Sequence, residues 1–133
     1  MSFEIREREK EGITILDLDG RLTAGEAGLV RDRVRERLAV GEIRFIFNLQ
    51  QVGYIDSTGL GALVMCYTGV EKAGGALKLL NLNRRNVELL ILTKLTTVFE
   101  IFNDEQDAVN SFFPNREIRR FDILDFVRRQ REE

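Results

Sequence analysis

The sequence predicts a single α/β domain, with one mixed β-sheet, about four helices packed on it and an amphipathic, helical tail at the C-terminus. Three observations lead to this prediction. Short apolar segments of strand length alternate with segments of helical period. Strands separated by single helices pair in parallel through right-handed crossovers, whereas a hairpin pattern at the N-terminus adds an antiparallel strand. The 133 residues, 44% of them hydrophobic, suffice for one domain with a sizeable core.

The N-terminal segments predict a β-hairpin followed by a helix. Apolar and charged residues alternate over residues 3–10, Gly12 marks the turn, and residues 13–18 form the second strand. Residues 21–23 can form a short third piece. A helix over residues 25–40 follows, because its apolar residues recur three and four positions apart: Ala27, Val30, Val34 and Leu38.

The central segments predict a buried strand, a helix and another strand. Residues 43–49 are nearly all apolar, as expected of a short strand that is buried on both faces. Residues 57–73 return to helical period and end at Gly74-Gly75, after which residues 76–82 form the next strand. Asn83 then fits an N-cap for a helix that carries Val87, Leu90 and Ile91.

The last part of the domain predicts one more strand and one more helix. Residues 98–102 have the composition of a strand. Asn103, followed three residues later by Gln106, resembles a capping box that opens a helix through Phe112. Pro114, the only proline, ends that helix.

The extension over residues 114–133 lies outside the domain plan, which covers residues 1–113. Residues 115–133 mix apolar side chains with six arginines and five acidic residues. On a helical wheel one broad apolar stripe is formed by Phe121, Ile123, Leu124 and Val127, with Ile118 and Phe126 off it. Two interpretations remain open: a terminal helix that covers leftover apolar surface of the domain, or a helix that docks on a partner or forms a homodimer. The balanced charge disfavours a membrane-surface helix.

Composition disfavours several classes of function. The net charge of −2 disfavours direct nucleic-acid binding, which needs a concentrated excess of basic residues. The chain has no histidine, which removes the usual general base and almost every zinc site, so we expect no metal and no cofactor. Cys66 is the only cysteine, so no internal disulfide can form. Because no apolar run reaches the length of a membrane span or a signal peptide, we expect a cytoplasmic protein without a membrane partner.

Residues 54–61, Tyr-Ile-Asp-Ser-Thr-Gly-Leu-Gly, place three short oxygen-bearing side chains where a strand gives way to a helix. The structural interpretation is an N-cap, because Asp, Ser and Thr oxygens accept hydrogen bonds from the first free N–H groups of a helix. A capping role alone does not explain Gly59 and Gly61, since each glycine destabilises a helix by on the order of 1 kcal/mol relative to alanine. That cost is easier to understand where another backbone or a protein partner comes close.

The outer face of the helix over residues 57–73 predicts a partner surface. A solvated helix normally carries charge on this face, but none occurs before Lys72 among Gly61, Ala62, Met65, Thr68 and Gly69. Small residues around one adaptable methionine suit packing against another protein. The alternative is that residues 115–133 or a loop cover this face.

The same residues disfavour catalysis. Ser57 as a nucleophile would need a base within reach, and no histidine is present, while Asp56 is expected to cap the helix or face solvent. The glycine-rich segment lacks the lysine and the spacing of a P-loop, and Gly20, Gly25 and Gly28 do not match the dinucleotide fingerprint. We therefore expect no enzymatic activity.

Residues 48–61, Asn-Leu-Gln-Gln-Val-Gly-Tyr-Ile-Asp-Ser-Thr-Gly-Leu-Gly, resemble the signature of STAS domains, in particular of bacterial anti-sigma-factor antagonists. The resemblance extends over about residues 3–113 and includes Gly20-Arg21-Leu22 and Ala73-Gly74-Gly75. It implies that Ser57 is phosphorylated by an anti-sigma factor with serine kinase activity and that a phosphatase restores the hydroxyl. The unphosphorylated form would bind the anti-sigma factor and free the sigma factor.

The resemblance also implies where the partner binds. It assigns the surface around Asp56, Thr58 and the following helix, and thus Gly59, Gly61, Ala62 and Met65. Family members often carry an acidic residue just after the Gly-x-Leu segment, where this chain has Thr23, so kinase recognition at Thr23 is expected to differ. Two alternative functions are a STAS subunit of an ABC-type transporter, never phosphorylated, and a scaffold subunit of a stress-sensing complex.

Overall fold

A five-stranded mixed sheet forms the centre of the computed structural model, which describes residues 3–132. The strands lie in the order of the chain: β1 (Glu4–Lys10), β2 (Ile13–Leu22), β3 (Arg44–Ile55), β4 (Ala76–Leu80) and β5 (Ile101–Phe102). β1 pairs antiparallel with β2, and the other neighbours pair in parallel. This arrangement confirms the predicted hairpin and the predicted parallel crossovers.

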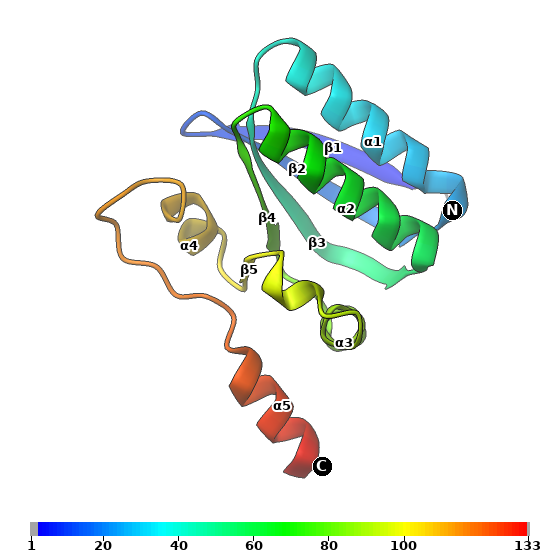
Figure 1. Cartoon of the computed structure of the whole chain (residues 1–133), viewed down its shortest axis with the longest axis vertical. Coiled ribbons are helices and arrows are strands. Elements are labelled where there is room, and N and C mark those ends of the chain that lie inside the picture. The colour runs from blue at the N-terminus through cyan, green and yellow to red at the C-terminus, as the bar shows by residue number, and fades with distance from the viewer. Residues whose placement is uncertain (1–2, 133) are drawn as a thin grey trace.

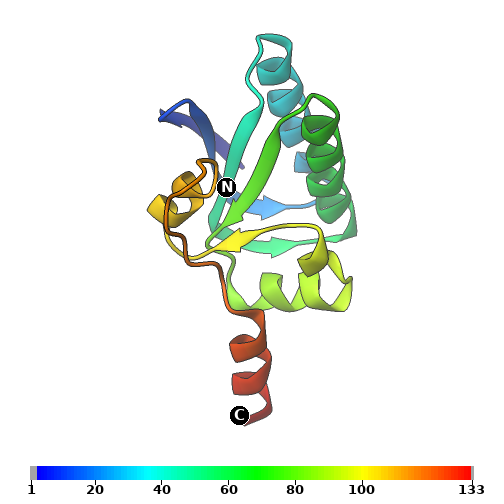
Figure 2. The same cartoon turned by 60° about the vertical axis from the view of Figure 1, so that its left-hand side comes forward.

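Helices cover both faces of this sheet unequally (Figures 1 and 2). α1 (Ala24–Ala39), α2 (Ser57–Lys72) and α3 (Arg84–Leu92) lie on one face, and the short α4 (Glu105–Asn110) lies on the other. α5 (Ile123–Glu132) projects from the end of the molecule beside α3. The prediction of about four packed helices and a helical tail is therefore confirmed, with an additional 3₁₀ turn at residues 95–97.

The alternation of side chains along the strands separates two hydrophobic clusters. Phe45 and Phe47 of β3 point into the large cluster beneath α1, α2 and α3, whereas Ile46 points into the small cluster beneath α4. All three side chains are fully buried. β3 is thus buried on both faces, as its apolar run predicts.

Two strands continue farther than the sequence predicts. β2 continues to Leu22, so residues 21–23 do not form a separate strand. The register with β3 shifts between Asp17 and Asp19 and between Gly20 and Arg21, and these irregularities interrupt the alternation of apolar and polar residues that marks a strand. β3 runs to Ile55, and its second half pairs with β2 alone, because β4 reaches only residues 44–48 of β3. A strand half that lacks a neighbour on one side carries polar residues and loses the continuous apolar pattern.

The C-terminal elements differ from the prediction in two details. β5 is only two residues long, because residues 95–99 form the 3₁₀ turn and its exit. The N-cap of α4 is Asp104 and not Asn103: the Asp104 carboxylate accepts hydrogen bonds from the backbone N–H groups of Gln106 and Asp107 at 2.7 and 3.1 Å. The predicted N-cap at Asn83 is confirmed, since its side chain accepts from the Asn86 N–H at 2.8 Å.

The C-terminal extension packs on its own domain. Phe121, Ile123 and Phe126 contact the large cluster, and the Phe121 N–H donates to the Ile101 carbonyl at 2.9 Å. This confirms the interpretation of a terminal segment that covers apolar surface. The predicted stripe is wrong in part, because Leu124 is 76% exposed whereas Phe126 packs inward. The helix begins only at Ile123, so a wheel that includes Phe121 does not describe it.

Candidate functional site

The candidate site lies at the carboxyl end of β2 and β3, where α1 and α2 begin. Leu22 and Ile55 are paired in register at the ends of these two strands, and the Asp56 N–H donates to the Leu22 carbonyl at 3.2 Å. Thr23 and Asp56 are the N-caps of α1 and α2. The two helix N-termini are therefore side by side at the edge of the sheet where α/β proteins commonly bind their ligands.

Asp56 connects these two helix N-termini. Its Oδ1 accepts a hydrogen bond from the Gly59 N–H at 2.8 Å, and its Oδ2 accepts one from the Ala24 N–H at 3.3 Å. The N-cap predicted within residues 56–58 is thus Asp56. Because both carboxylate oxygens already accept backbone hydrogen bonds, Asp56 orients the site whether or not a partner also contacts it.

Ser57 and Thr58 are the first two residues of α2, and both are exposed. Since Asp56 supplies the cap, the Ser57 hydroxyl is not required for it. Within residues 3–132, no protein group forms a hydrogen bond with either hydroxyl. The first turn of a helix also offers unpaired N–H groups and a partial positive charge to an anion at this position.

The two glycines of this turn differ in their surroundings. A Cβ on Gly59 would overlap the carbonyl oxygen of Leu22, so glycine is needed there for the close approach of α2 to β2. A Cβ on Gly61 would meet nothing within 4 Å. The suspected close approach of another backbone therefore explains Gly59, whereas Gly61 leaves the surface flat and open.

The face of α2 that looks uncharged in the sequence borders α1. Between the two helices is a groove of about 430 Å³, lined by Ala24, Gly25, Ala27, Gly28, Arg31, Thr58, Gly61, Ala62 and Met65. Met65 is 56% exposed, whereas Ala62 is only 3% exposed, so the assignment of Ala62 to the outer face is wrong. The Arg31 guanidinium lies 3.4 Å from the Met65 sulfur and gives the groove a positive charge that the pattern of α2 alone does not contain.

Within the described part of the tail, residues 115–132 do not cover this face. The extension packs near α3, and α5 lies away from α1 and α2 (Figures 1 and 2). The alternative that the tail shields the uncharged face is therefore wrong. The exposed end of α2 remains available for a partner.

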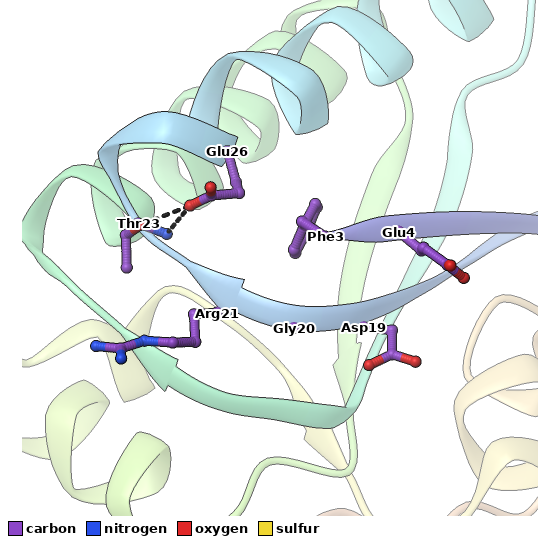
Figure 3. Close-up of a pocket in the computed structure, with 7 residues that line it drawn as sticks. All are labelled: Phe3, Glu4, Asp19, Gly20, Arg21, Thr23 and Glu26. Atoms are coloured by element: carbon purple, nitrogen blue, oxygen red, sulfur yellow. Dashed lines mark hydrogen bonds between the residues drawn. The ribbon is translucent and has the colours of Figure 1, made fainter. Parts of the chain in front are cut away.

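Glu26 is a residue of the site that the sequence analysis missed. Its carboxylate accepts hydrogen bonds from the Thr23 backbone N–H at 3.3 Å and from the Thr23 hydroxyl (Figure 3). The two residues border a groove of about 710 Å³, which is also lined by Phe3, Glu4, Asp19, Gly20 and Arg21. The spacing of Thr23 and Glu26 matches a capping box, and this local signal could have identified the carboxylate beside Thr23.

The described residues include one free cysteine, Cys66, and its side chain is buried. Burial raises the pKa of the Cys66 thiol to about 12, so this group is not a reactive thiolate. Residues 3–132 contain no group of three or more His, Cys, Asp or Glu placed to hold a metal ion. In the same part of the chain no helix is both long enough and apolar enough to cross a membrane.

Comparisons with known proteins agree with this architecture. Residues 4–108 match the family model of the STAS domain. The chain is 30% identical to the anti-sigma-B factor antagonist of Bacillus subtilis over 82% of this chain and 99% of that protein. It is 32% identical to the protein of the same name from Listeria monocytogenes, over 79% and 91%.

A solved structure supports the same fold. A proposed anti-sigma factor antagonist from Thermotoga maritima superimposes with a TM-score of 0.77 at 24% identity, covering 80% of this chain and 92% of the other. On the family match, and on the identity to the Bacillus and Listeria proteins, the chain belongs to the STAS domain family.

Proposed function

We propose that this protein is an anti-sigma-factor antagonist that acts by partner switching. It binds an anti-sigma factor with serine kinase activity when Ser57 is unphosphorylated and releases it when Ser57 is phosphorylated; a phosphatase restores the hydroxyl. The observation that carries this proposal is the exposed Ser57 hydroxyl at the start of α2, free of the capping role that Asp56 fills. The names of the Bacillus and Listeria relatives support the choice of partner.

The surroundings of Ser57 fit a switch without a large rearrangement. A phosphoserine carries close to two negative charges, and the N-terminus of α2 stabilises them in the free protein. In a complex the same dianion would be desolvated close to the carboxylate of Asp56. A penalty of about 3 kcal/mol corresponds to roughly hundredfold weaker binding, which is enough to exchange partners.

The partner surface in this proposal follows α2 from its exposed first turn. Thr58, Gly61 and Met65 border the groove between α1 and α2, and Thr23 lies beside it at the start of α1. Gly59 and Ala62 act beneath this surface, because one allows the contact with β2 and the other packs between the helices. The carboxylate of Glu26, which accepts a hydrogen bond from the Thr23 N–H, is the acid that a basic group of the kinase would contact at the start of α1.

The protein in this proposal is a substrate and not an enzyme, and it acts in the cytoplasm. The raised pKa of Cys66 and the lack of histidine support the first statement. The proposal also includes a homodimer through the C-terminal tail. Leu92 and Leu124, which are 81% and 76% exposed on α3 and α5, would be its contacts.

Intact-mass analysis after incubation with anti-sigma-factor kinases and ATP tests the switch. We expect one added phosphate in the wild type and in Thr58→Ala, and none in Ser57→Ala. Calorimetry should show roughly hundredfold weaker binding of the kinase to the phosphorylated protein. Kinase binding to Ser57→Asp that equals the wild type would contradict the proposal. Co-purification with a membrane ATPase would favour the transporter subunit, and a large homotypic particle would favour the scaffold.

A further inference from the structure

Two arginines and one tyrosine form a cluster at the same edge of the sheet as Ser57. The guanidinium carbon of Arg21 lies 4.7 Å from the centroid of the Tyr54 ring, and that of Arg85 lies 4.3 Å from it. Arg21 and Tyr54 are paired in register near the ends of β2 and β3, and Arg85 is the second residue of α3. The two cations are therefore held on one aromatic ring, three positions before the phosphoacceptor.

These two arginines have no carboxylate partner in the described part of the chain, residues 3–132. Figure 3 shows the side chain of Arg21 pointing away from Asp19 and Glu26. Other arginines around the sheet do form ion pairs: Arg8 lies 2.6 Å from Asp17, and Arg116 lies 3.1 Å from Glu11. Both Arg21 and Arg85 are exposed, so their guanidinium groups can meet a group from solution.

The position of Arg85 is unfavourable for α3 itself. Arg84 and Arg85 occupy the first turn, and this turn contains no acidic residue. A helix N-terminus carries a partial positive charge, so arginines in the first turn are electrostatically unfavourable. An anion from outside would relieve this repulsion. The arrangement is thus better explained by recognition of an anion than by stability of the helix.

The chemistry of the cluster selects carboxylates on a protein. An arginine stacked on an aromatic ring is weakly hydrated and already oriented, and its planar group binds carboxylates through two parallel hydrogen bonds. A nucleic acid is disfavoured, because the cluster holds only two cations and the net charge of the chain is −2.

We infer that Arg21, Tyr54 and Arg85 form a docking site for an acidic segment of the partner protein, beside the phosphoacceptor Ser57. This inference rests on the proposed function for the identity of the partner. An acidic segment held there would orient the partner on α2 before the hydroxyl is engaged. Its binding would weaken as ionic strength rises, because the contacts are charged and exposed.

The site can be tested without the natural partner. A short polyglutamate peptide is titrated into the full chain, and the Nε–H signals of Arg21 and Arg85 and the ring signals of Tyr54 are followed by NMR. We expect saturable shifts at these three residues, weakened about tenfold by the double variant Arg21→Ala/Arg85→Ala. Arg44→Ala is the matched control, because it removes an exposed arginine from the opposite end of β3 and should leave binding unchanged.

Further variants separate docking from a structural role. The double variant Arg21→Lys/Arg85→Lys keeps the charge and the fold while it removes the planar groups, so it should bind the peptide at intermediate strength. Equal peptide affinity in the alanine double variant and the wild type overturns the inference, even if the alanine variant has a lower melting temperature. Equal shifts with inorganic phosphate, or tighter binding of a single-stranded oligonucleotide, also overturn it.

The natural partner distinguishes this inference from the proposed function. Peptide docking together with a Ser57 that no kinase modifies would contradict the proposed function alone. Normal phosphorylation of Ser57, with unchanged kinase affinity in Arg21→Ala/Arg85→Ala, would contradict the inference alone.

Discussion

The N-terminus of α2 and the C-terminal helix α5 are both exposed, but for different reasons. α2 buries Leu60, Leu63 and Val70 in the large cluster and is capped by Asp56. Its exposed hydroxyls therefore lie on a helix that is firmly packed against the sheet. α5 reaches the same cluster through partly buried residues such as Phe126. Exposure on a well-packed element indicates a functional surface, whereas exposure on a weakly packed element indicates low local stability.

The largest change in stability is expected from Gly59→Ala in the first turn of α2. The new Cβ would overlap the Leu22 carbonyl oxygen, which belongs to the sheet and cannot move aside. We expect the free energy of unfolding to fall by about 3 kcal/mol, measured by urea denaturation. Gly61→Ala is the matched control: it meets open space and should raise stability by up to about 1 kcal/mol. Equal effects of the two changes would mean that α2 is not held against β2 as described.

A smaller effect is expected from Phe126→Ala in α5. The side chain packs on the large cluster but is only partly buried, so we expect a loss of about 1–2 kcal/mol in urea denaturation. Leu124→Ala, which changes a side chain that is 76% exposed, should alter stability by less than about 0.5 kcal/mol. Neither change should affect the phosphorylation of Ser57. A larger loss from Leu124→Ala would indicate that α5 has a different contact in solution, such as a second copy of the chain.

The smallest effect concerns α4, a short helix that an ion pair ties to the hairpin. The Arg8 guanidinium lies 2.7 Å from Glu105, and its hydrogen bonds hold the pKa of Glu105 below the ordinary value of 4.5. A lowered pKa in the folded state gives stability that is present above pH 4.5 and is lost as the pH falls through the folded value. Because the pair is partly exposed, we expect less than about 1 kcal/mol.

Arg8→Gln removes the ion pairs of Arg8 with both Glu105 and Asp17, and the pH dependence of unfolding tests their combined contribution. The variant should be less stable than the wild type at neutral pH, and the difference should shrink as the solution is acidified below pH 4.5. Arg6→Gln serves as the control, because Arg6 and its partner Glu4 are 73% and 54% exposed and contribute little. A difference that grows towards acid would show that Arg8 acts through another group.

Those parts of the site that depend on neighbouring residues in the chain were predictable from the sequence. Asp56 follows a strand and precedes a helical pattern, so its cap is readable from the sequence, as is the cap at Asn83. Glu26 was readable in the same way from its spacing to Thr23, and it was missed. Arg21 and Arg85 could not be found, because 64 positions separate them in the chain and only the β2–β3 register and the start of α3 bring both to Tyr54.

The sequence by itself determined the α/β class, the parallel crossovers and the oxygen-bearing turn at residues 56–58, because each depends on the order of neighbouring side chains. Only the tertiary structure decided which of these side chains are available. It turned Ala62 towards α1, directed Phe126 inward and left Leu124 in solvent, and placed residues 115–132 away from α2. Helical period specifies that a helix has two faces, but what each face meets depends on elements that are distant in the chain.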